Sequence, residues 1–217
     1  MADALAITDG IKPNLPVVEI ERITSDGTPI TLLELEQRHG NVTLLELIVL
    51  SRLVRERAPR SLFEIGTFDG RTTLNLAANA PDDAVVHTLD LPPNRPTAYA
   101  LSPADYQFVN KPASGARITA GACAERVRQL YGDSATFDFT PYKADFVFVD
   151  GSHAYEYVLS DSMRALALIG EGPAVIAWHD YGVWDGVTRG LEELASTDPR
   201  FQNLQWVRGT SLVVMVR

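Results

Sequence analysis

Two groups of polar residues in the second half of the chain have the types and spacing that a catalytic or metal-binding site needs. Asp150 and His153 follow one apolar run, and His179 and Asp180 follow the next. Polar side chains at the carboxyl ends of apolar strands are typical of binding sites in open α/β sheets. Asp150, His179 and Asp180 offer oxygen and imidazole ligands to one divalent ion. His153 would lie near enough to act as a general base, although a helix-capping Asp150 and a surface His153 are the structural alternatives.

A glycine-containing turn earlier in the chain is the candidate cofactor site. The strand-like run 61–65 leads into Gly66 and Gly70, where a helix pattern starts. Backbone N–H groups and the positive end of a helix dipole converge at such a turn and bind polar or anionic groups. The spacing lacks the third glycine of the dinucleotide fingerprint and the lysine of a phosphate loop, which disfavours both of those classes. The structural alternative is a turn that only joins strand to helix.

Acidic residues after two further strand-like runs could bind the rest of a nucleoside. Asp90 stands near the end of the run 85–91, where a carboxylate can accept both hydroxyls of a ribose. Asp133 and Ser134 follow the run 127–131 and could offer a carboxylate or a hydroxyl to the edge of a base. A capping or solvated Asp90 and a plain turn after the second run are the structural alternatives.

The elements that would position these residues alternate between strand and helix. We expect strands at 61–65, 85–91, 127–131, 144–149 and 174–178, and helices at 70–80, 155–169 and 186–195. This alternation predicts an α/β fold with an open, doubly wound, mostly parallel sheet. The runs 204–207 and 211–216 flank a tight turn around Gly209, which predicts an antiparallel hairpin at the end of the sheet.

The first forty residues differ from the rest and are expected to form an N-terminal arm, 1–40, ahead of a single domain, 41–217. The segment contains an alternating run at 17–23 and a turn signal at 25–27, which predict either a small hairpin or an extended arm. A helix is expected over 41–58, capped by Asn41 and ended by a proline. Its broad apolar face makes a homodimer one expectation.

The segment 92–125 has no clear periodicity and is rich in proline and glycine. An aperiodic stretch of this length in a compact domain is usually an insertion or lid over a binding site. Tyr99, Tyr106 and Phe108 within it could wall an apolar or aromatic substrate, or could belong to a local core.

The composition limits the classes of partner. The 217 residues include 19 basic and 28 acidic side chains, for a net charge of −9, so a nucleic acid is not an expected partner. The longest apolar stretch, 44–50, is broken by Glu46, which argues against a membrane span. The chain has one cysteine and starts without a signal-peptide pattern, so a cytoplasmic protein is expected.

Taken together, these motifs resemble the class I S-adenosylmethionine (SAM)-dependent methyltransferases. The most similar group is the metal-dependent small-molecule O-methyltransferases, including the macrocin O-methyltransferase and cephalosporin-hydroxylase-like branch. The resemblance covers roughly residues 60 to 216. It implies a Rossmann-like, doubly wound, mostly parallel seven-stranded sheet with an antiparallel C-terminal hairpin strand, and SAM as the cofactor.

The resemblance also implies roles for individual residues. The loop of Gly66 would hold the methionine end of SAM, Asp90 the ribose, and Asp133 with Ser134 the adenine. The full set of implied cofactor contacts is Glu64, Gly66, Thr67, Phe68, Gly70, Asp90, Leu91, Asp133, Ser134 and Asp150.

The implied metal site and base come from the two polar groups in the second half of the chain. Asp150, His179 and Asp180 would face magnesium or another divalent ion that binds and acidifies the substrate hydroxyl, and His153 matches the place of the proposed base. Position 179 is usually acidic in this branch, and histidine is a poorer ligand for magnesium. The metal could therefore be lost, changed or coordinated differently.

The expected function is methyl transfer from SAM to a small molecule, with oxygen as the acceptor atom that best suits a metal and a base. Nitrogen and carbon acceptors stay open. Two other readings are a NAD-dependent oxidoreductase on a Rossmann-like sheet and a non-catalytic cofactor-binding module.

Overall fold

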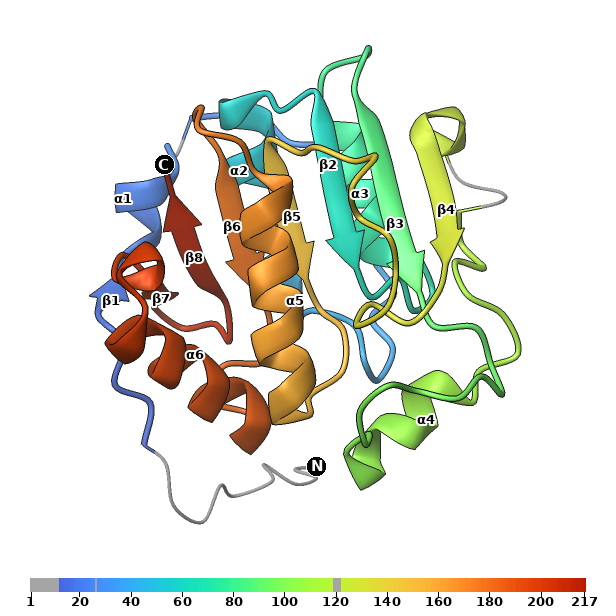
Figure 1. Ribbon diagram of the computed structural model, residues 1–217. Helices are drawn as coiled ribbons and strands as arrows, with labels where there is room; N and C mark the ends of the chain where they lie inside the picture. Colours follow the sequence, from blue (N-terminus) through green and yellow to red (C-terminus); the bar gives the residue numbers. More distant parts are fainter. Residues whose placement is uncertain (1–11, 26, 119–121) are drawn as a thin grey trace.

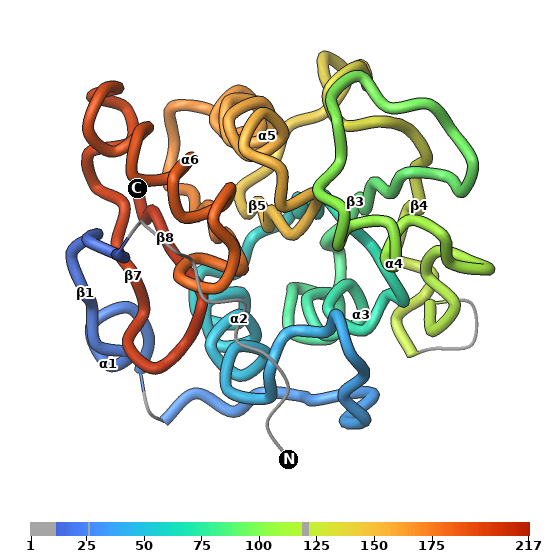
Figure 2. The backbone as a smooth tube through the Cα atoms, turned by 90° about the horizontal axis from the view of Figure 1, so that it is seen from below, coloured from blue at the N-terminus to red at the C-terminus, as the bar shows by residue number. Residues whose placement is uncertain are grey.

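The computed structural model describes residues 12–25, 27–118 and 122–217, which form a sheet covered by helices on both faces (Figure 1). Within these residues the sheet has eight strands in the order β1-β7-β8-β6-β5-β2-β3-β4. Helices α5 and α6 lie on one face, and α2 and α3 lie on the other (Figure 2). This is the three-layer arrangement that the alternation of strands and helices predicts.

Five parallel strands form the centre and one side of the sheet. They are β2 (Ser61–Ile65), β3 (Val85–Asp90), β4 (Val127–Tyr131), β5 (Phe146–Val149) and β6 (Val175–Trp178). β8 (Val213–Val216) pairs antiparallel with β6 and with β7 (Gln205–Val207), which confirms the expected terminal hairpin. All residues of β5 and β6 are buried, as expected for central strands covered on both faces.

The helices are α1 (Ile20–Ile23), α2 (Leu44–Arg57), α3 (Arg71–Asn79), α4 (Tyr106–Val109), α5 (Tyr155–Leu168) and α6 (Asp185–Thr197). Short 3₁₀ turns span Pro103–Asp105, Ala124–Arg126 and Pro199–Phe201. Apart from the arm and α2, the expected elements are confirmed to within two residues at each end. No helix in the described part of the chain is both long and apolar enough to cross a membrane.

The expected N-terminal hairpin is wrong. Val17 and Val18, which form β1, pair in parallel with β7 and add an eighth strand to the expected seven. Without β1, the backbone N–H groups at this edge of β7 would have no strand partner. In the structure, the Trp206 N–H donates to Pro16 O at 2.8 Å and the Arg208 N–H donates to Val18 O at 3.0 Å. The chain then turns into α1, and Asp26 of the expected turn lies outside the described residues, as does the arm before residue 12.

Helix α2 begins three residues later than expected, because Thr43 rather than Asn41 caps it. The Thr43 Oγ1 accepts from the Glu46 N–H at 3.3 Å, and Glu46 Oε2 accepts from the Thr43 N–H at 2.7 Å. This reciprocal pair is a capping box. Most of the apolar face of α2 packs within the chain and leaves Leu44 and Leu45 exposed, so the homodimer stays a prediction.

The sheet register places the residues that matter for the site next to one another. Ile65 of β2 pairs with Leu89 of β3 and with Val149 of β5, and Val149 pairs in turn with Trp178 of β6. The residues that follow these four therefore emerge side by side at the carboxyl edge of the sheet; they are Gly66, Asp90, Asp150 and His179. The arrowheads of β2, β3 and β5 point to this edge, and α4 lies just beyond it (Figure 1).

Candidate active site

A cavity of about 310 Å³ lies at the carboxyl edge of the sheet. Its walls come from the ends of five parallel strands, from residues 39–41 of the N-terminal segment, and from the segment 92–118. The predicted site residues that line it are Gly66, Phe68, Asp90, Leu91, Asp133, Ser134, Asp150, His153, His179 and Asp180. Glu64, Thr67 and Gly70 do not line it in the described structure. The fold thus brings both predicted polar groups and most of the predicted cofactor contacts to one cavity.

The loop after β2 passes directly against the end of β5. Gly66 has φ of +102°, and a Cβ at this position would lie 1.9 Å from the backbone oxygen of Asp150. Only glycine fits such a close approach. Phe68 also has positive φ, at 49°, which is uncommon for a bulky residue. The loop therefore holds its backbone close to the cavity.

Glu64 and Thr67 lie behind the cavity wall. Glu64 is fully buried, and its carboxyl group accepts from Thr73 and, at 2.5 Å, from Thr88. Burial raises the pKa of Glu64 to about 8, so the group is mostly protonated at neutral pH. Thr67 shares a hydrogen bond of 2.6 Å with Thr88. These residues support the loop from behind, and their direct contact with a cofactor stays a prediction.

Gly70 has φ of +88° at the start of α3, and a Cβ there would lie 2.5 Å from the side chain of Ile118. It therefore allows Ile118 of the aperiodic segment to pack closely on the loop, and the direct contact of Gly70 with a cofactor likewise stays a prediction.

Asp90 forms a buried ion pair that the sequence analysis missed. The Lys111 Nζ lies 2.8 Å from Asp90 Oδ2, with the two side chains 10% and 8% exposed. Lys111 also donates to the backbone oxygen of Phe108 at 3.0 Å. Lys111 belongs to the aperiodic segment, where no pattern indicates its partner. The carboxylate expected to bind a ribose is thus occupied by a lysine of the chain itself.

The carboxylate of Asp133 is also engaged with the chain. It accepts from the N–H of Ala98 at 2.6 Å, from the N–H of Ala135 at 3.0 Å and from the Tyr157 hydroxyl at 2.9 Å. Burial and this carboxylate raise the pKa of Tyr157. Ala98 and Lys111 both belong to the aperiodic segment 92–118, so this segment contacts the cavity at both Asp90 and Asp133.

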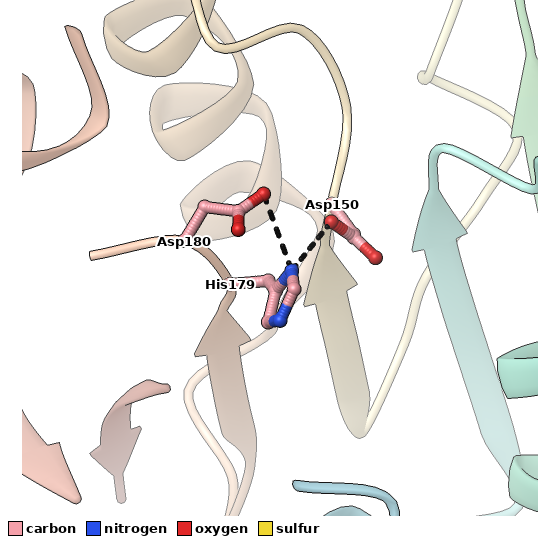
Figure 3. Close-up of side chains that lie close together, drawn as sticks. All are labelled: Asp150, His179 and Asp180. Atoms are coloured by element: carbon pink, nitrogen blue, oxygen red, sulfur yellow. Dashed lines mark hydrogen bonds and ion pairs between the residues drawn. The ribbon is translucent and has the colours of Figure 1, made fainter. Parts of the chain in front are cut away.

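Asp150, His179 and Asp180 form a tight cluster at the ends of β5 and β6 (Figure 3). The Nδ1 of His179 lies 3.0 Å from Asp150 Oδ1 and 3.2 Å from Asp180 Oδ2. Asp180 has φ of +69°, an uncommon conformation that turns its side chain back toward the cavity edge. Burial favours the neutral imidazole, but the carboxylates of Asp180 and Asp150 outweigh it and raise the pKa of His179 well above its usual value.

Glu46 completes this cluster from the other side of His179. Its Oε2 lies 3.2 Å from His179 Nε2, and its Oε1 accepts from the Ser211 N–H at 2.7 Å. Burial acts to raise the pKa of Glu46, but His179 and the backbone hydrogen bonds together lower it to about 2. The sequence analysis noted Glu46 only as a break in an apolar run, and its role in a capping box hides the second role.

The donor set fits a divalent ion. One ligand atom each from Asp150, His179 and Asp180 lie within 4.8 Å of one another. Glu46 would hold the Nε2 proton and leave Nδ1 for the ion, which is the carboxylate–histidine arrangement common around metals. Two carboxylates with one imidazole suit manganese or zinc better than magnesium. When no ion is bound, the protonated imidazole supplies the positive charge between the carboxylates.

His153 is held on three sides. Its Nδ1 contacts Asp105 Oδ1, its Nε2 lies 2.8 Å from Asp180 Oδ2, and its ring stacks on Trp184 with centroids 4.3 Å apart. Burial alone would lower the pKa of His153, but hydrogen bonds to Asp105 and Asp180 raise it to about 9. Asp105 lies in the aperiodic segment and was not predicted from the sequence.

The expected aromatic wall is only partly correct. Phe108 lines the cavity, and its ring packs against the rings of three residues. The ring centroids are 5.5 Å apart for His39, 5.9 Å for Phe68 and 5.8 Å for His153. Tyr99 and Tyr106 do not line it; they are 41% and 53% exposed, and Tyr99 packs edge-on against Tyr157. The apolar wall is completed mainly by aliphatic residues and by Trp184.

The fold and the cavity define the class of protein. A glycine loop after the first central strand, an acidic residue after the next, and an antiparallel last strand are the features of a Rossmann-like methyltransferase domain. Residues 63–181, more than half of the chain, match the family described as "Methyltransferase domain". The chain therefore belongs to this methyltransferase family. No curated protein matches the chain in sequence.

Solved structures of methyltransferases share the fold. The O-methyltransferase TomG from Streptomyces achromogenes, involved in tomaymycin synthesis and solved with SAM, is 20% identical with a TM-score of 0.56, and the match covers 85% of this chain and 92% of TomG. An O-methyltransferase from Bacillus cereus, solved with S-adenosylhomocysteine (SAH), is 18% identical with a TM-score of 0.55. This match covers 83% of this chain and 84% of the Bacillus cereus chain. A SAH-bound methyltransferase from Podospora anserina is 15% identical with a TM-score of 0.58. This match covers 82% of this chain and 80% of the Podospora anserina chain.

Proposed function

We propose that the protein transfers a methyl group from SAM to a hydroxyl of a small molecule, assisted by a divalent ion and a histidine base. The observation that carries this proposal is the convergence, in one cavity, of the glycine loop, Asp90 and the cluster of Asp150, His153, His179 and Asp180. Family membership supports the methyl transfer. The SAM- and SAH-bound relatives with the same fold support SAM as the donor.

The cofactor would lie along the carboxyl edge of the sheet. The methionine end would contact the loop of Gly66 and Phe68, the ribose would bond to Asp90, and the adenine would lie near Asp133 and Ser134. This order follows the strand order, since Asp90 ends the strand next to β2 and Asp133 follows the strand next to that. The methyl group would then face the cluster at Asp150.

The ion would be held by Asp150, His179 and Asp180, with Glu46 orienting His179 through Nε2. A bound divalent ion supplies positive charge that lowers the pKa of an acceptor hydroxyl. The chain itself aligns the acceptor oxygen with the methyl carbon and the sulfur, which provides much of the rate enhancement in a reaction of this kind.

His153 would accept the hydroxyl proton at Nε2. The acceptor oxygen then forms a bond to the methyl carbon while the bond from carbon to sulfur breaks, and the electron pair neutralises the sulfonium. Since the pKa of His153 is about 9, the neutral imidazole is a minority at pH 7 and becomes more abundant toward pH 9. We therefore expect turnover to increase with pH across this range.

The first test is calorimetric titration of SAM and, separately, NAD into the purified protein, each with added divalent ion and with a chelator. We expect micromolar binding of SAM in both conditions and none of NAD. Absence of SAM binding would refute the proposal, and binding of NAD alone would favour an oxidoreductase.

The second test measures SAH release with a panel of phenols, catechols and sugar derivatives. We expect at least one hydroxyl compound to be methylated, with less product after chelation. Adding amines and carbon acceptors to the panel tests the alternatives, and SAM binding without turnover on any of these compounds would favour a non-catalytic module. The exposed substitution Asp82→Asn serves as the control, because this side chain is fully exposed.

A further inference from the structure

Asp105 is the buried carboxylate that is least expected from its surroundings. It lies in the 3₁₀ turn Pro103–Asp105, at the start of a short helix in a segment whose other residues are mostly exposed, yet it is only 2% exposed. A buried carboxylate must be satisfied by hydrogen bonds, so its partners indicate why it is there.

Every hydrogen bond that the described part of the chain makes to this carboxylate comes from one turn. Asp105 Oδ2 accepts from Ser152 Oγ at 2.6 Å and from the His153 N–H at 3.2 Å, and Oδ1 contacts His153 Nδ1. A single carboxylate thus holds both the backbone and the ring of His153. Asp105 and His153 are separated by 48 positions in the sequence.

The remaining contacts leave the ring of His153 one orientation. Because a carboxylate can only accept, each ring nitrogen carries a proton in this arrangement: the Nδ1 proton is directed at the buried Asp105, and Nε2, at the edge of the cavity, faces Asp180. Trp184 stacks on the ring with an angle of 15° between the planes, and Phe108 contacts it at 69°. A ring flip would break the contacts with Asp105 and Asp180 together.

The segment that carries Asp105 is itself fixed to the cavity. Lys111, two residues after the end of α4, pairs with Asp90, and Phe108 of α4 lines the cavity. Further along, the Gly115 N–H donates to Phe68 O at 2.8 Å. The insertion is thus attached both to the cofactor loop and to the turn of His153.

We propose that Asp105 is a positioning residue that holds the Nδ1 proton of His153 and so directs Nε2 toward the acceptor hydroxyl. The insertion then contributes to catalysis as well as covering the cavity. This inference rests on the proposed function, in which His153 is the base. An aspartate that fixes the tautomer of a catalytic histidine has large effects on turnover in other enzymes without touching the substrate.

The test compares wild type with Asp105→Asn, Ser152→Ala and the exposed control Asp82→Asn. Ring nitrogen NMR of the four histidines reports the tautomer and orientation of His153 directly. We expect a slowly exchanging Nδ1 proton in wild type, which Asp105→Asn removes and Ser152→Ala retains. Calorimetry should give the same SAM affinity in wild type and Asp105→Asn, within about twofold.

With whichever compound of the hydroxyl panel wild type methylates fastest, Asp105→Asn should lower kcat about a hundredfold or more and leave KM nearly unchanged. Asp82→Asn should behave as wild type. A His153 ring signal or a kcat in Asp105→Asn equal to that of Asp82→Asn would overturn the inference.

Two complications have separate outcomes. If Asp105→Asn does not fold, the wild-type spectrum decides, since an unprotonated Nδ1 there contradicts the inference. If wild type methylates nothing in the panel, the proposed function fails while the NMR comparison still decides whether Asp105 positions the ring.

Discussion

Replacing Lys111 by methionine is expected to tighten SAM binding while it destabilises the free protein. In the structure, Lys111 Nζ lies 2.8 Å from Asp90, the carboxylate proposed to bind the ribose, and both side chains are nearly buried. In the proposed binding mode, the ribose hydroxyls and the ammonium group therefore compete for the same carboxylate. Methionine keeps much of the length and apolar volume of lysine and removes the ammonium group, with its charge and its hydrogen bond to the backbone oxygen of Phe108.

The magnitude follows from the burial of the pair. Removing one partner of a buried ion pair costs about 3–5 kcal/mol, because the other charge stays buried without compensation. Hydrogen bonds to a charged group are worth about 1.5–3 kcal/mol each, so a bound ribose recovers part of this cost. If about 1–2 kcal/mol of this recovered free energy is added to the free energy of SAM binding, the Kd for SAM falls by roughly 5- to 30-fold.

Calorimetry with three ligands tests the explanation as well as the effect. SAM and adenosine should both bind more tightly to Lys111→Met, whereas 2′,3′-dideoxyadenosine, which lacks the hydroxyls, should bind both proteins equally. Lys143→Met, at an exposed lysine, is the control and should change neither binding nor thermal stability. Weaker SAM binding in Lys111→Met would refute the reasoning, because Lys111 would then be a ligand of the cofactor rather than its competitor.

Three further substitutions test the cavity and its supports. The folded pKa of Glu64, about 8, exceeds the ordinary value of 4.5, so the folded chain keeps a proton that the unfolded chain loses as pH rises between these values. In urea unfolding, the free energy of unfolding of wild type should therefore fall relative to that of Glu64→Gln from pH 5 to pH 9, by at most roughly 5 kcal/mol. The same dependence of this free energy on pH in both proteins would contradict the prediction. Gly66→Ala should cost about 3 kcal/mol or more by thermal unfolding and abolish SAM binding, since its Cβ would overlap the Asp150 carbonyl, whereas Gly172→Ala, with open space around it, should be neutral. Zinc or manganese binding near pH 7 should release about one proton from the imidazole of His179, measured by calorimetry in two buffers. His179→Asp should abolish that release and favour magnesium, and equal release from both proteins would show that His179 is not a ligand.

The central sheet and the residues at its carboxyl edge could be predicted because their signals are local. Apolar runs such as 144–149 and 174–178 predict buried strands wherever they occur, and the polar residues that follow such strands meet at one edge by the geometry of a parallel sheet. Asp150, His153, His179 and Asp180 were therefore expected together, and the structure brings them to one cavity.

The N-terminal hairpin and the Asn41 cap were wrong because the outcome depended on distant partners. β1 pairs with β7, which is almost two hundred residues away and whose free edge no local pattern near residue 17 can indicate. Thr43 and Asn41 are both good capping residues, and Asn41 instead donates to Asp69 at 3.0 Å.

The chain's own pattern was thus enough to predict the class of fold and the convergence of Asp150, His153, His179 and Asp180 at the carboxyl edge of the sheet. Tertiary structure alone decided how each of these residues is controlled. Glu46 reaches His179 across 133 positions, and Asp105 and Lys111 reach His153 and Asp90 from a segment without periodicity. In their local surroundings these three side chains are typical of a helix cap and of loop residues. Their partners are set by which surfaces the packed sheet and insertion bring together, and periodicity carries no information about that.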